Sequence, residues 1–338
     1  MKKTTLAAVA ACLLLLISLS TGCKSDKPAP PPPAVDTPAK PEVKVPRFNR
    51  DSAYAYIEKQ VAFGPRVPNT AAHRACAAWL ESKLKSMDVK VIAQNFEASA
   101  YDGTRLKGVN FIASYKPEHP TRILLAAHWD SRHISDHDPD EANRDKPVLG
   151  ADDGGSGVGV LIEVLRTLKE NPLDLGVDVV LFDLEDYGEG GGTGNINSWC
   201  LGSQYWGNNL HVAGYRAKYG ILLDMVGAKN ARFTKEGTSM QYAPRIMHKV
   251  WRLAQDLGYG AYFVNDPTSP ITDDHLFVNK ITGIPTIDII NRPVDSKTGF
   301  GHYWHTQKDD MSVIDKRTLR AVGQTVITVL YQESAGNF

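Results

Sequence analysis

Acidic residues and histidines follow three short apolar runs of the sequence, at 123–127, 177–181 and 221–223. Short continuous apolar runs are typical of strands that are buried on both faces of a parallel sheet. Ligands of open α/β sheets bind beyond the carboxyl ends of such strands. We therefore expect one sheet edge to gather the polar residues that come after these runs, which are His128, Asp130, Glu185, Asp186 and Asp224.

This set of residues could carry metal-assisted acid–base chemistry. Carboxylate oxygens and imidazole nitrogens bind catalytic zinc, which needs three protein ligands and an open position. Several carboxylates in one cleft repel one another unless a cation neutralises them. Adjacent Glu185 and Asp186 can divide the work, because one carboxylate can bind metal while the other moves protons. Taken singly, each acid could equally be an exposed loop residue. Further candidates of the same types are Asp152, Asp153, Asp273, Asp274, His275 and His305.

The elements that must position these residues alternate between strands and helices. The sequence predicts strands at 89–96, 109–115, 123–127, 177–181, 221–223 and 286–290. Helical spacing of apolar residues predicts helices at 51–63, 70–87, 157–169, 243–257 and 314–331. This alternation favours an α/β fold with a mostly parallel central sheet sandwiched by helices. No second linker or repeat interrupts residues 47–338, so we expect a single domain there.

Five short motifs occur in order along the chain, namely GADD at 150–153, FDLED at 182–186, LLDMVGA at 222–228, DDH at 273–275 and WHT at 304–306. The series resembles the zinc aminopeptidase superfamily, and within it the animal-type glutaminyl-peptide cyclotransferases, or glutaminyl cyclases. Several motifs in the same order are far more specific than any one of them. The resemblance implies an aminopeptidase-like fold and one zinc ion per chain.

Matched position by position, the resemblance implies that Asp153, Asp186 and His305 bind the zinc. Asp186 is a departure, because the animal cyclotransferases have glutamate at this position. The shorter side chain still offers a carboxylate oxygen, but its backbone must approach the metal more closely. We expect the substitution to keep the ligand set intact.

The same matching implies that Glu185 is the general acid and base. Asp224 and Asp273 would form hydrogen bonds near it, orienting the substrate and adjusting the proton affinity of Glu185. In a cyclotransferase, the α-amine of an N-terminal glutamine attacks the side-chain amide of the same residue, and ammonia leaves. Because the nucleophile belongs to the substrate, positioning supplies much of the rate. We expect an aromatic, dry pocket.

Aromatic residues near the motifs fit such a pocket. Trp304 and Phe300 match the cyclotransferase pattern, and Trp199 is a further candidate for the pocket wall, although ordinary core packing would explain each of them. His128 lies where aminopeptidases bind a second metal ion, and animal cyclotransferases keep a histidine there without using it as a ligand. We expect a cyclotransferase acting on peptides with N-terminal glutamine. The alternatives are a zinc aminopeptidase and a non-catalytic peptide-binding lipoprotein.

The first 22 residues have the pattern of a bacterial export signal. Lys2 and Lys3 precede an apolar stretch that is short for a transmembrane helix. The sequence STGC at 20–23 resembles a lipobox, in which Cys23 would carry a lipid anchor, while an ordinary secretory signal is the alternative. The proline-rich segment 23–46 cannot bury a core and predicts an extended tether. We therefore expect an exported, periplasmic protein that is anchored to a bacterial membrane.

Composition and residue spacing argue against several other functions. Lys and Arg number 38, as do Asp and Glu, so the net charge is zero and nucleic acid is not an expected partner. Cys12 lies in the expected export signal and Cys23 is the expected lipid attachment site, while the pairing of Cys76 with Cys200 stays open. Aspartates alternate at 136–140 as in a calcium loop, but Pro139 and the missing glycine favour a solvated acidic loop.

Overall fold

The computed structural model describes residues 42–191 and 195–338. The expected export signal, Cys23 and most of the expected tether lie outside the described residues, so these remain predictions. Val43 and Val45, near the end of the tether segment, are partly buried against the core of the domain that follows. Within the described ranges, no helix is both long enough and apolar enough to cross a bilayer.

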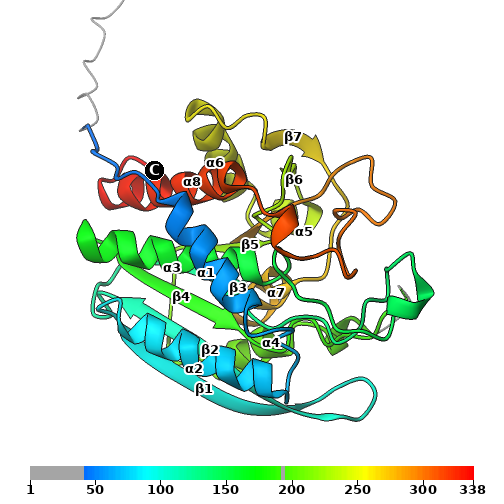
Figure 1. Cartoon of the computed structure of the whole chain (residues 1–338). Helices are drawn as coiled ribbons and strands as arrows, with labels where there is room; N and C mark the ends of the chain where they lie inside the picture. Colours follow the sequence, from blue (N-terminus) through cyan, green and yellow to red (C-terminus); the bar gives the residue numbers. More distant parts are fainter. Residues whose placement is uncertain (1–41, 192–194) are drawn as a thin grey trace, which may run out of the picture. The chain divides into compact units, whose positions relative to one another are not determined.

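A mixed six-stranded sheet runs through the described domain, with strand order β1-β2-β4-β3-β5-β8 (Figure 1). Strands β4, β3, β5 and β8 are parallel neighbours, whereas β2 pairs antiparallel with both β1 and β4. The strands span Lys90–Ser99 (β1), Arg105–Tyr115 (β2), Arg122–His128 (β3), Gly176–Phe182 (β4), Gly220–Asp224 (β5) and Thr286–Ile290 (β8).

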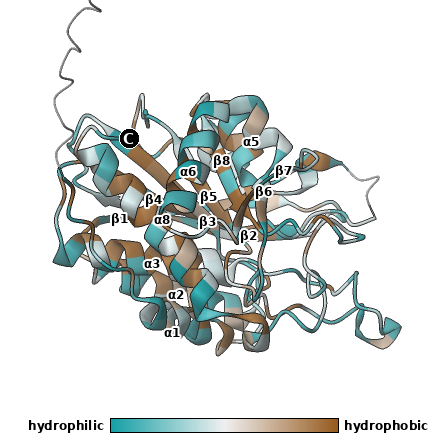
Figure 2. Ribbon diagram, turned by 90° about the horizontal axis from the view of Figure 1, so that it is seen from above, coloured by the Kyte–Doolittle hydropathy of each residue, from teal (hydrophilic) through white to brown (hydrophobic). Residues whose placement is uncertain are grey.

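Helices cover both faces of this sheet. Neighbouring residues of a strand point to opposite faces, and Val179 and Val180 of β4 accordingly belong to different apolar clusters. The larger cluster joins the sheet to α1, α2, α3, α6 and α8, and the smaller joins it to α4 and the π-helix Val278–Thr282. Figure 2 shows hydrophobic strands between the helices. The helices span Arg50–Val61 (α1), Ala71–Lys85 (α2), Gly155–Glu170 (α3), Leu201–Asn208 (α4), Gly237–Tyr242 (α5), Pro244–Asp256 (α6), Asp274–Phe277 (α7) and Lys316–Ser334 (α8).

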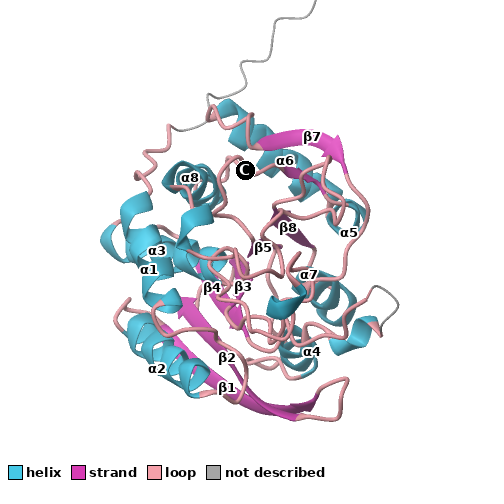
Figure 3. Cartoon of the chain, turned by 45° about the vertical axis from the view of Figure 1, so that its right-hand side comes forward, coloured by secondary structure: helices cyan, strands magenta, loops and turns pink. Residues whose placement is uncertain are grey.

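The predicted fold class is confirmed, and burial explains why. Strands β3, β4, β5 and β8 are buried at every position, so each is mostly apolar in the sequence, although β4 also buries Asp178 and β8 buries Asp288. Helix α4 was not predicted, because its residues LGSQYWGN include too few apolar side chains to show a clear helical spacing. The small parallel sheet of β6 (Phe233–Lys235) and β7 (Phe263–Pro267), which lies near α6, was not predicted either (Figure 3).

Side-chain caps fix where several helices begin. Asn49 accepts hydrogen bonds from the backbone N–H groups of Asp51 and Ser52 at the start of α1. Thr70 caps α2 and Asp315 caps α8 in the same way. A cap of this kind satisfies a backbone donor that the helix itself leaves free, and its loss costs about 1 kcal/mol.

Glu236 is a buried cap whose charge stabilises the fold. It accepts hydrogen bonds from the backbone N–H groups of Thr238 (2.6 Å) and Ser239 (2.7 Å), and its Oε2 lies 3.0 Å from Nε2 of His275. Burial alone would raise the pKa of Glu236, but the bond and charge of His275 and the two N–H groups lower it to about 2. Unfolding returns this pKa to its ordinary value near 4.5, so the unfolded chain binds the proton first as the pH falls.

We expect Glu236→Gln to lower the free energy of unfolding by roughly 3 kcal/mol at pH 7, since a pKa unit corresponds to about 1.4 kcal/mol. The difference from the unsubstituted protein should be complete above pH 4.5 and should shrink as the pH falls towards 2. Urea unfolding of metal-free protein at pH 7 and pH 3 measures it. Exposed Glu58 supplies the control substitution Glu58→Gln. An equal loss at both pH values would contradict the assigned charge effect.

Candidate active site

Two strands deliver polar residues to one pocket, and a third brings His128 into contact with two of the residues that line it. β3 ends at His128, β5 ends at Asp224, and Glu185 follows the end of β4 after two intervening residues. The pocket has a volume of about 580 Å³. All nine residues to which the sequence analysis assigns a catalytic, substrate-binding or metal-binding role line it, namely Asp153, Glu185, Asp186, Trp199, Asp224, Asp273, Phe300, Trp304 and His305.

The three expected zinc ligands converge in this pocket. Nε2 of His305 lies 3.3 Å from Oδ1 of Asp186 and 3.8 Å from Oδ2 of Asp153. One ligand atom from each residue lies within 4.8 Å of the other two, and all three residues are buried. The set of one imidazole and two carboxylates suits zinc. The shorter side chain of Asp186 therefore still reaches the other ligands.

The opposite nitrogen of His305 is also positioned. Its Nδ1 lies 3.2 Å from Oδ1 of Asp136, an arrangement that typically fixes the orientation of a metal-binding imidazole. Arg132 holds Asp136 in turn through two contacts of 2.8 Å. Burial tends to raise the pKa of Asp136, but His305 and Arg132 lower it well below its usual range. Asp136 thus stays an anion, and Nε2 of His305 is left to face the ligand site.

Buried carboxylates that do not enter the ligand set hold its backbone. Asp130 accepts hydrogen bonds from the N–H groups of Glu185 and Asp186, each at 3.1 Å. Asp309 accepts from the N–H groups of Asp152 (2.8 Å) and Asp153 (3.1 Å). These hydrogen bonds fix the peptide groups of Asp153 and Asp186, which are two of the expected zinc ligands. The sequence gives no signal for Asp309, because it lies four residues beyond the nearest matched histidine and outside the motif.

Residues next to the site adopt left-handed backbone conformations that favour glycine. The φ angles are +57° at Leu184, +56° at Cys200, +46° at Met225 and +55° at His305. Each such conformation costs on the order of 1 kcal/mol or more and persists only when its surroundings enforce it. Their concentration around one pocket indicates a backbone that is shaped for function.

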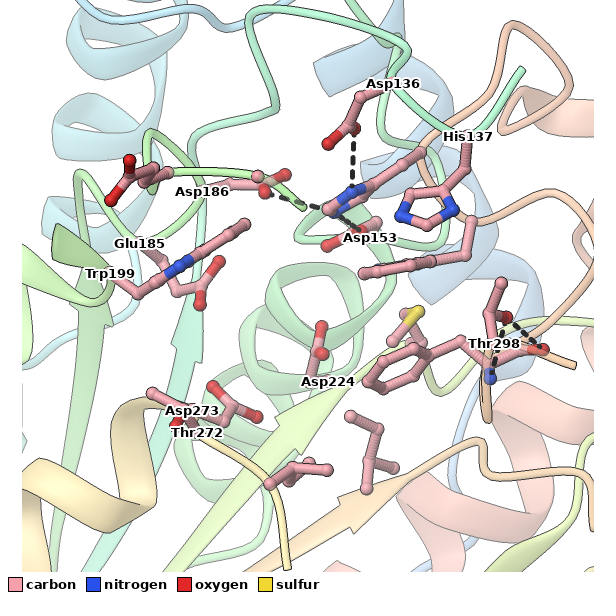
Figure 4. A pocket seen from close by; sticks show the side chains of 18 of the residues that line it. Asp136, His137, Asp153, Glu185, Asp186, Trp199, Asp224, Thr272, Asp273 and Thr298 are labelled. Carbon is pink, nitrogen blue, oxygen red and sulfur yellow. Dashed lines mark hydrogen bonds and ion pairs between the residues drawn. The ribbon is translucent and has the colours of Figure 1, made fainter. Parts of the chain in front are cut away.

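Glu185 has the environment of a general acid and base. Its side chain is 12% exposed, and it points into the pocket with Asp224 and Asp273 (Figure 4). Burial raises the pKa of Glu185 well above its ordinary value; the charges of Asp186 and Asp273 add to this effect, and His128 opposes it. A carboxyl group whose proton affinity is raised towards neutrality is suited to taking and returning a proton.

Asp224 and Asp273 flank Glu185 as expected. Burial raises the pKa of Asp224 to about 8, Asp153 adds to the rise, and a hydrogen bond with His128 opposes it. Asp273 caps α7 through its Oδ1, while its Oδ2 is buried without a hydrogen-bond partner in the described part of the chain. The structure thus places both carboxyl groups in the lining of the pocket, together with Glu185.

The three expected aromatic residues surround the ligand site. The ring of Trp304 lies 3.7 Å from that of His305 (centroid to centroid), and Phe300 packs on Trp304 at 4.4 Å. The ring of Trp199 lies 6.2 Å from His305 and is nearly parallel to it. The guanidinium of Arg132 lies 4.7 Å from the Trp199 ring centroid, which holds this wall in place.

Gly188 makes room for Trp199. A Cβ at this position would lie 1.9 Å from Cδ2 of the Trp199 ring, so any larger residue must displace the ring. We expect Gly188→Ala to raise the KM for substrate about fivefold with zinc content unchanged, because an aromatic contact contributes about 1 kcal/mol. Steady-state kinetics measure this. Gly260→Ala is the control, since its nearest new contact is 3.7 Å away. An unchanged KM in Gly188→Ala would remove Trp199 from the binding wall.

His128 stands at a second group of candidate ligands. Its Nε2 lies 3.0 Å from Oδ1 of Asp153 and 3.2 Å from Oδ1 of Asp224. Asp153 therefore lies between the two groups, with one oxygen towards His128 and the other towards His305. A carboxylate in this position could bridge two metal ions, which is the arrangement of a two-metal site.

The sequence analysis was wrong about part of the loop at 136–140. Asp136 is not a solvated acid, because it is partly buried, pairs with Arg132 and lines the pocket. Asp138 is buried and accepts a hydrogen bond from the backbone of Gln307. Asp140 matches the expected exposure, whereas His137 of the same loop, although exposed, packs on Trp304. The contacts of Asp138 with Gln307 and of His137 with Trp304 join residues far apart in sequence, so spacing could not reveal them.

The two cysteines of the described domain are both free and both buried, which answers the open question about their pairing. Cys76 lies in α2. Cys200 lies directly before α4 and contacts Glu185, a neighbour that the sequence did not indicate.

A family model, described as peptidase family M28, matches residues 110–330. The chain belongs to peptidase family M28. This M28 protein is 52% identical to the glutaminyl cyclase of Bacteroides thetaiotaomicron, with a TM-score of 0.83, over 85% of this chain and 99% of the other. It is 55% identical to a Zn-dependent exopeptidase from Parabacteroides distasonis, with the same TM-score and the same coverage. The glutaminyl-peptide cyclotransferase of Drosophila melanogaster is 27% identical over 280 residues, which are 75% of this chain and 73% of the relative. The predicted membership of the zinc aminopeptidase superfamily, and the likeness to its cyclotransferases, are confirmed.

Proposed function

We propose that this M28 protein is a zinc-dependent glutaminyl-peptide cyclotransferase, which converts N-terminal glutamine of peptides and proteins to pyroglutamate and releases ammonia. The observation that carries the proposal is Glu185, a buried carboxyl of raised pKa in an aromatic pocket beside three convergent zinc ligands. The similarity to glutaminyl cyclases over nearly their whole length supports it.

The reaction forms one bond and breaks one. The α-amine nitrogen of the substrate attacks the carbon of its own side-chain amide, and the bond from that carbon to the amide nitrogen breaks. Glu185 accepts a proton from the attacking amine and returns it to the departing nitrogen, so that ammonia leaves and the enzyme is unchanged. Zinc held by Asp153, Asp186 and His305 would supply a positive charge that polarises the amide oxygen.

The other pocket residues orient the substrate and exclude water. Asp224 and Asp273 accept hydrogen bonds from the substrate amine and amide, which sets the distance between the two reacting groups. Trp304, Phe300 and Trp199 enclose the glutamine side chain, and a dry wall limits hydrolysis of the amide. A reaction within one residue needs no bound water as nucleophile.

A zinc aminopeptidase is the second candidate, and the position of His128 favours it. Asp153 lies between His128 and His305, as a ligand that bridges two metal ions must. Two metal ions would position a water molecule for attack on the peptide bond. The two candidates therefore differ both in their product and in their metal content.

One experiment separates the candidates. The purified, zinc-loaded protein is incubated with a peptide that begins with glutamine, and the products are followed by mass spectrometry. Loss of ammonia from an intact peptide, with about one zinc per chain, is the expected result. Release of free glutamine, with two zinc ions per chain, would establish the aminopeptidase. If neither product forms, the protein would instead be a non-catalytic peptide-binding lipoprotein.

We also propose that the enzyme is exported to the periplasm and held on a bacterial membrane through a lipid on Cys23. The lipobox-like sequence before Cys23 and the proline-rich segment after it support this proposal. Cys23→Ala should move the protein from the membrane fraction to the soluble periplasmic fraction. Retention of the substituted protein on the membrane would contradict the anchor.

A further inference from the structure

Cys200 holds the carboxyl group of Glu185 through its thiol. Its Sγ lies 3.2 Å from Oε1 of Glu185, in a geometry in which the S–H donates to the carboxylate. In the described residues this is the one hydrogen bond recorded for the Glu185 side chain; Nδ1 of His128 lies 3.9 Å from Oε2. The thiol therefore fixes one carboxylate oxygen and leaves the other to face the pocket.

Backbone hydrogen bonds hold Cys200 in position beside Glu185. The N–H of Cys200 donates to the carbonyl of Glu185 at 2.9 Å, and the N–H of Leu201 donates to the carbonyl of Leu184 at 2.9 Å. These paired bonds tie the start of α4 to the segment after β4. Both Leu184 and Cys200 have left-handed φ angles, which glycine would adopt more easily. A cysteine is strained in this conformation, so the surrounding structure must enforce the position of its side chain.

The surroundings of the thiol show what that role is. One ligand-type atom from each of Glu185, Cys200 and Asp273 lies within 4.8 Å of the other two, and Cys200 is completely buried. Two carboxyl groups this close repel each other when both are charged. Burial raises the pKa of the Cys200 thiol well above its ordinary value, and the charges of Glu185, Asp273 and Asp274 raise it further. The thiol thus keeps its proton and serves as a donor between the acids.

We propose that Cys200 is a positioning residue of the active site, whose S–H group orients the Glu185 carboxylate for proton transfer. The proposal rests on the function proposed above for Glu185, but it does not depend on which reaction Glu185 serves. It predicts that kcat depends on a donor at position 200, while substrate binding and zinc content do not.

The test compares three substitutions at position 200 in the zinc-loaded protein. Cys200→Ala removes the donor and should lower kcat about tenfold with KM changed less than about twofold, because a hydrogen bond to a charged group contributes about 1.5 kcal/mol. Cys200→Ser keeps a donor and should restore kcat to within about threefold. Cys200→Gly relieves the left-handed backbone and lacks the donor, so it should fold and still show the kcat loss.

The other buried cysteine supplies a matched control. The Cys76 thiol has no hydrogen bond recorded within the described ranges, and it lies in α2, away from the pocket lining. Cys76→Ala should therefore keep kcat. Rates are measured on whichever reaction the unsubstituted enzyme catalyses, cyclisation or peptide hydrolysis. A failure of the proposed function thus shows in the product, whereas a failure of this proposal shows in the variants.

Infrared spectroscopy tests the contact without activity. The S–H stretching band that disappears in Cys200→Ser should lie at lower wavenumber than the Cys76 band, and Glu185→Ala should shift it back towards the Cys76 value. Three results would overturn the proposal: an unshifted band, equal kcat in Cys200→Ala and Cys76→Ala, or zinc loss in Cys200→Ala, which would make Cys200 a metal ligand.

Discussion

Glu185→Gln is expected to lower kcat at least about a hundredfold, because the amide cannot accept a proton from the substrate amine, and general acid–base catalysis contributes roughly 10²–10⁴-fold. The substitution keeps the size and shape of the side chain. The backbone N–H of residue 185 still donates to Asp130, so the fold should be unchanged. Ammonia release under saturating substrate measures kcat, and metal analysis should return the same zinc content as the unsubstituted protein.

Glu189 provides the matched control for this experiment. It is a second glutamate of the pocket lining, but it is exposed and its Oε2 accepts a hydrogen bond from the backbone of Asn195. Glu189→Gln should therefore keep kcat within about twofold, since Glu189 does not accept or donate a proton in the proposed reaction. If Glu185→Gln turned over as fast as Glu189→Gln, another group would have to be the base.

Asp186→Asn should remove the zinc and the activity together. An amide oxygen carries no charge, and zinc prefers carboxylate, imidazole and thiolate ligands, so the site would keep only Asp153 and His305. We expect bound zinc to fall from about one ion per chain to near zero after dialysis. Metal analysis and kcat measure the two effects. The substitution changes only the side chain of residue 186. Its backbone N–H can still donate to Asp130, so the fold should persist.

His128→Gln is the control substitution for Asp186→Asn. His128 contacts Asp153 and Asp224 but lies outside the proposed ligand set. In a cyclotransferase with one zinc, the substitution should leave the zinc content unchanged. A fall from two ions to one would instead show that His128 binds a second metal and would support the aminopeptidase. Full zinc retention in Asp186→Asn would contradict the proposed ligand set.

Much of the fold was predictable because burial leaves a direct signal in the sequence. Strand β4 is completely buried and is apolar except at Asp178, and the interiors of β3 and β5 are apolar throughout. Helix α4 left no such signal, because its eight residues mix polar and aromatic side chains and pack in two directions, with Trp206 in one apolar cluster and Leu201 and Tyr205 against another. Tertiary packing, rather than local preference, determines that it is helical.

The site was predictable to the extent that its residues sit in motifs at strand ends. Residues such as Asp153 and His305 were found by matched motifs, and their shared pocket by the edge rule for parallel sheets. Arg132 and Asp136 were not found, because Asp136 contacts His305 across about half of the chain length and neither residue belongs to a matched motif. Cys200 was considered only as half of a disulfide, since the sequence cannot show that α4 places its thiol beside Glu185.

The left-handed residues around the pocket have a consequence for how this enzyme can change. Leu184, Cys200, Met225 and His305 keep conformations that a glycine or asparagine would hold at lower cost. Selection for thermal stability alone would favour such replacements. Each of these residues, however, either belongs to the active site or lies next to a residue that must be positioned accurately there. Stability and catalysis therefore compete at these four positions. Efforts to make the protein more heat-resistant should start elsewhere, in the exposed surfaces of helices such as α1 and α2.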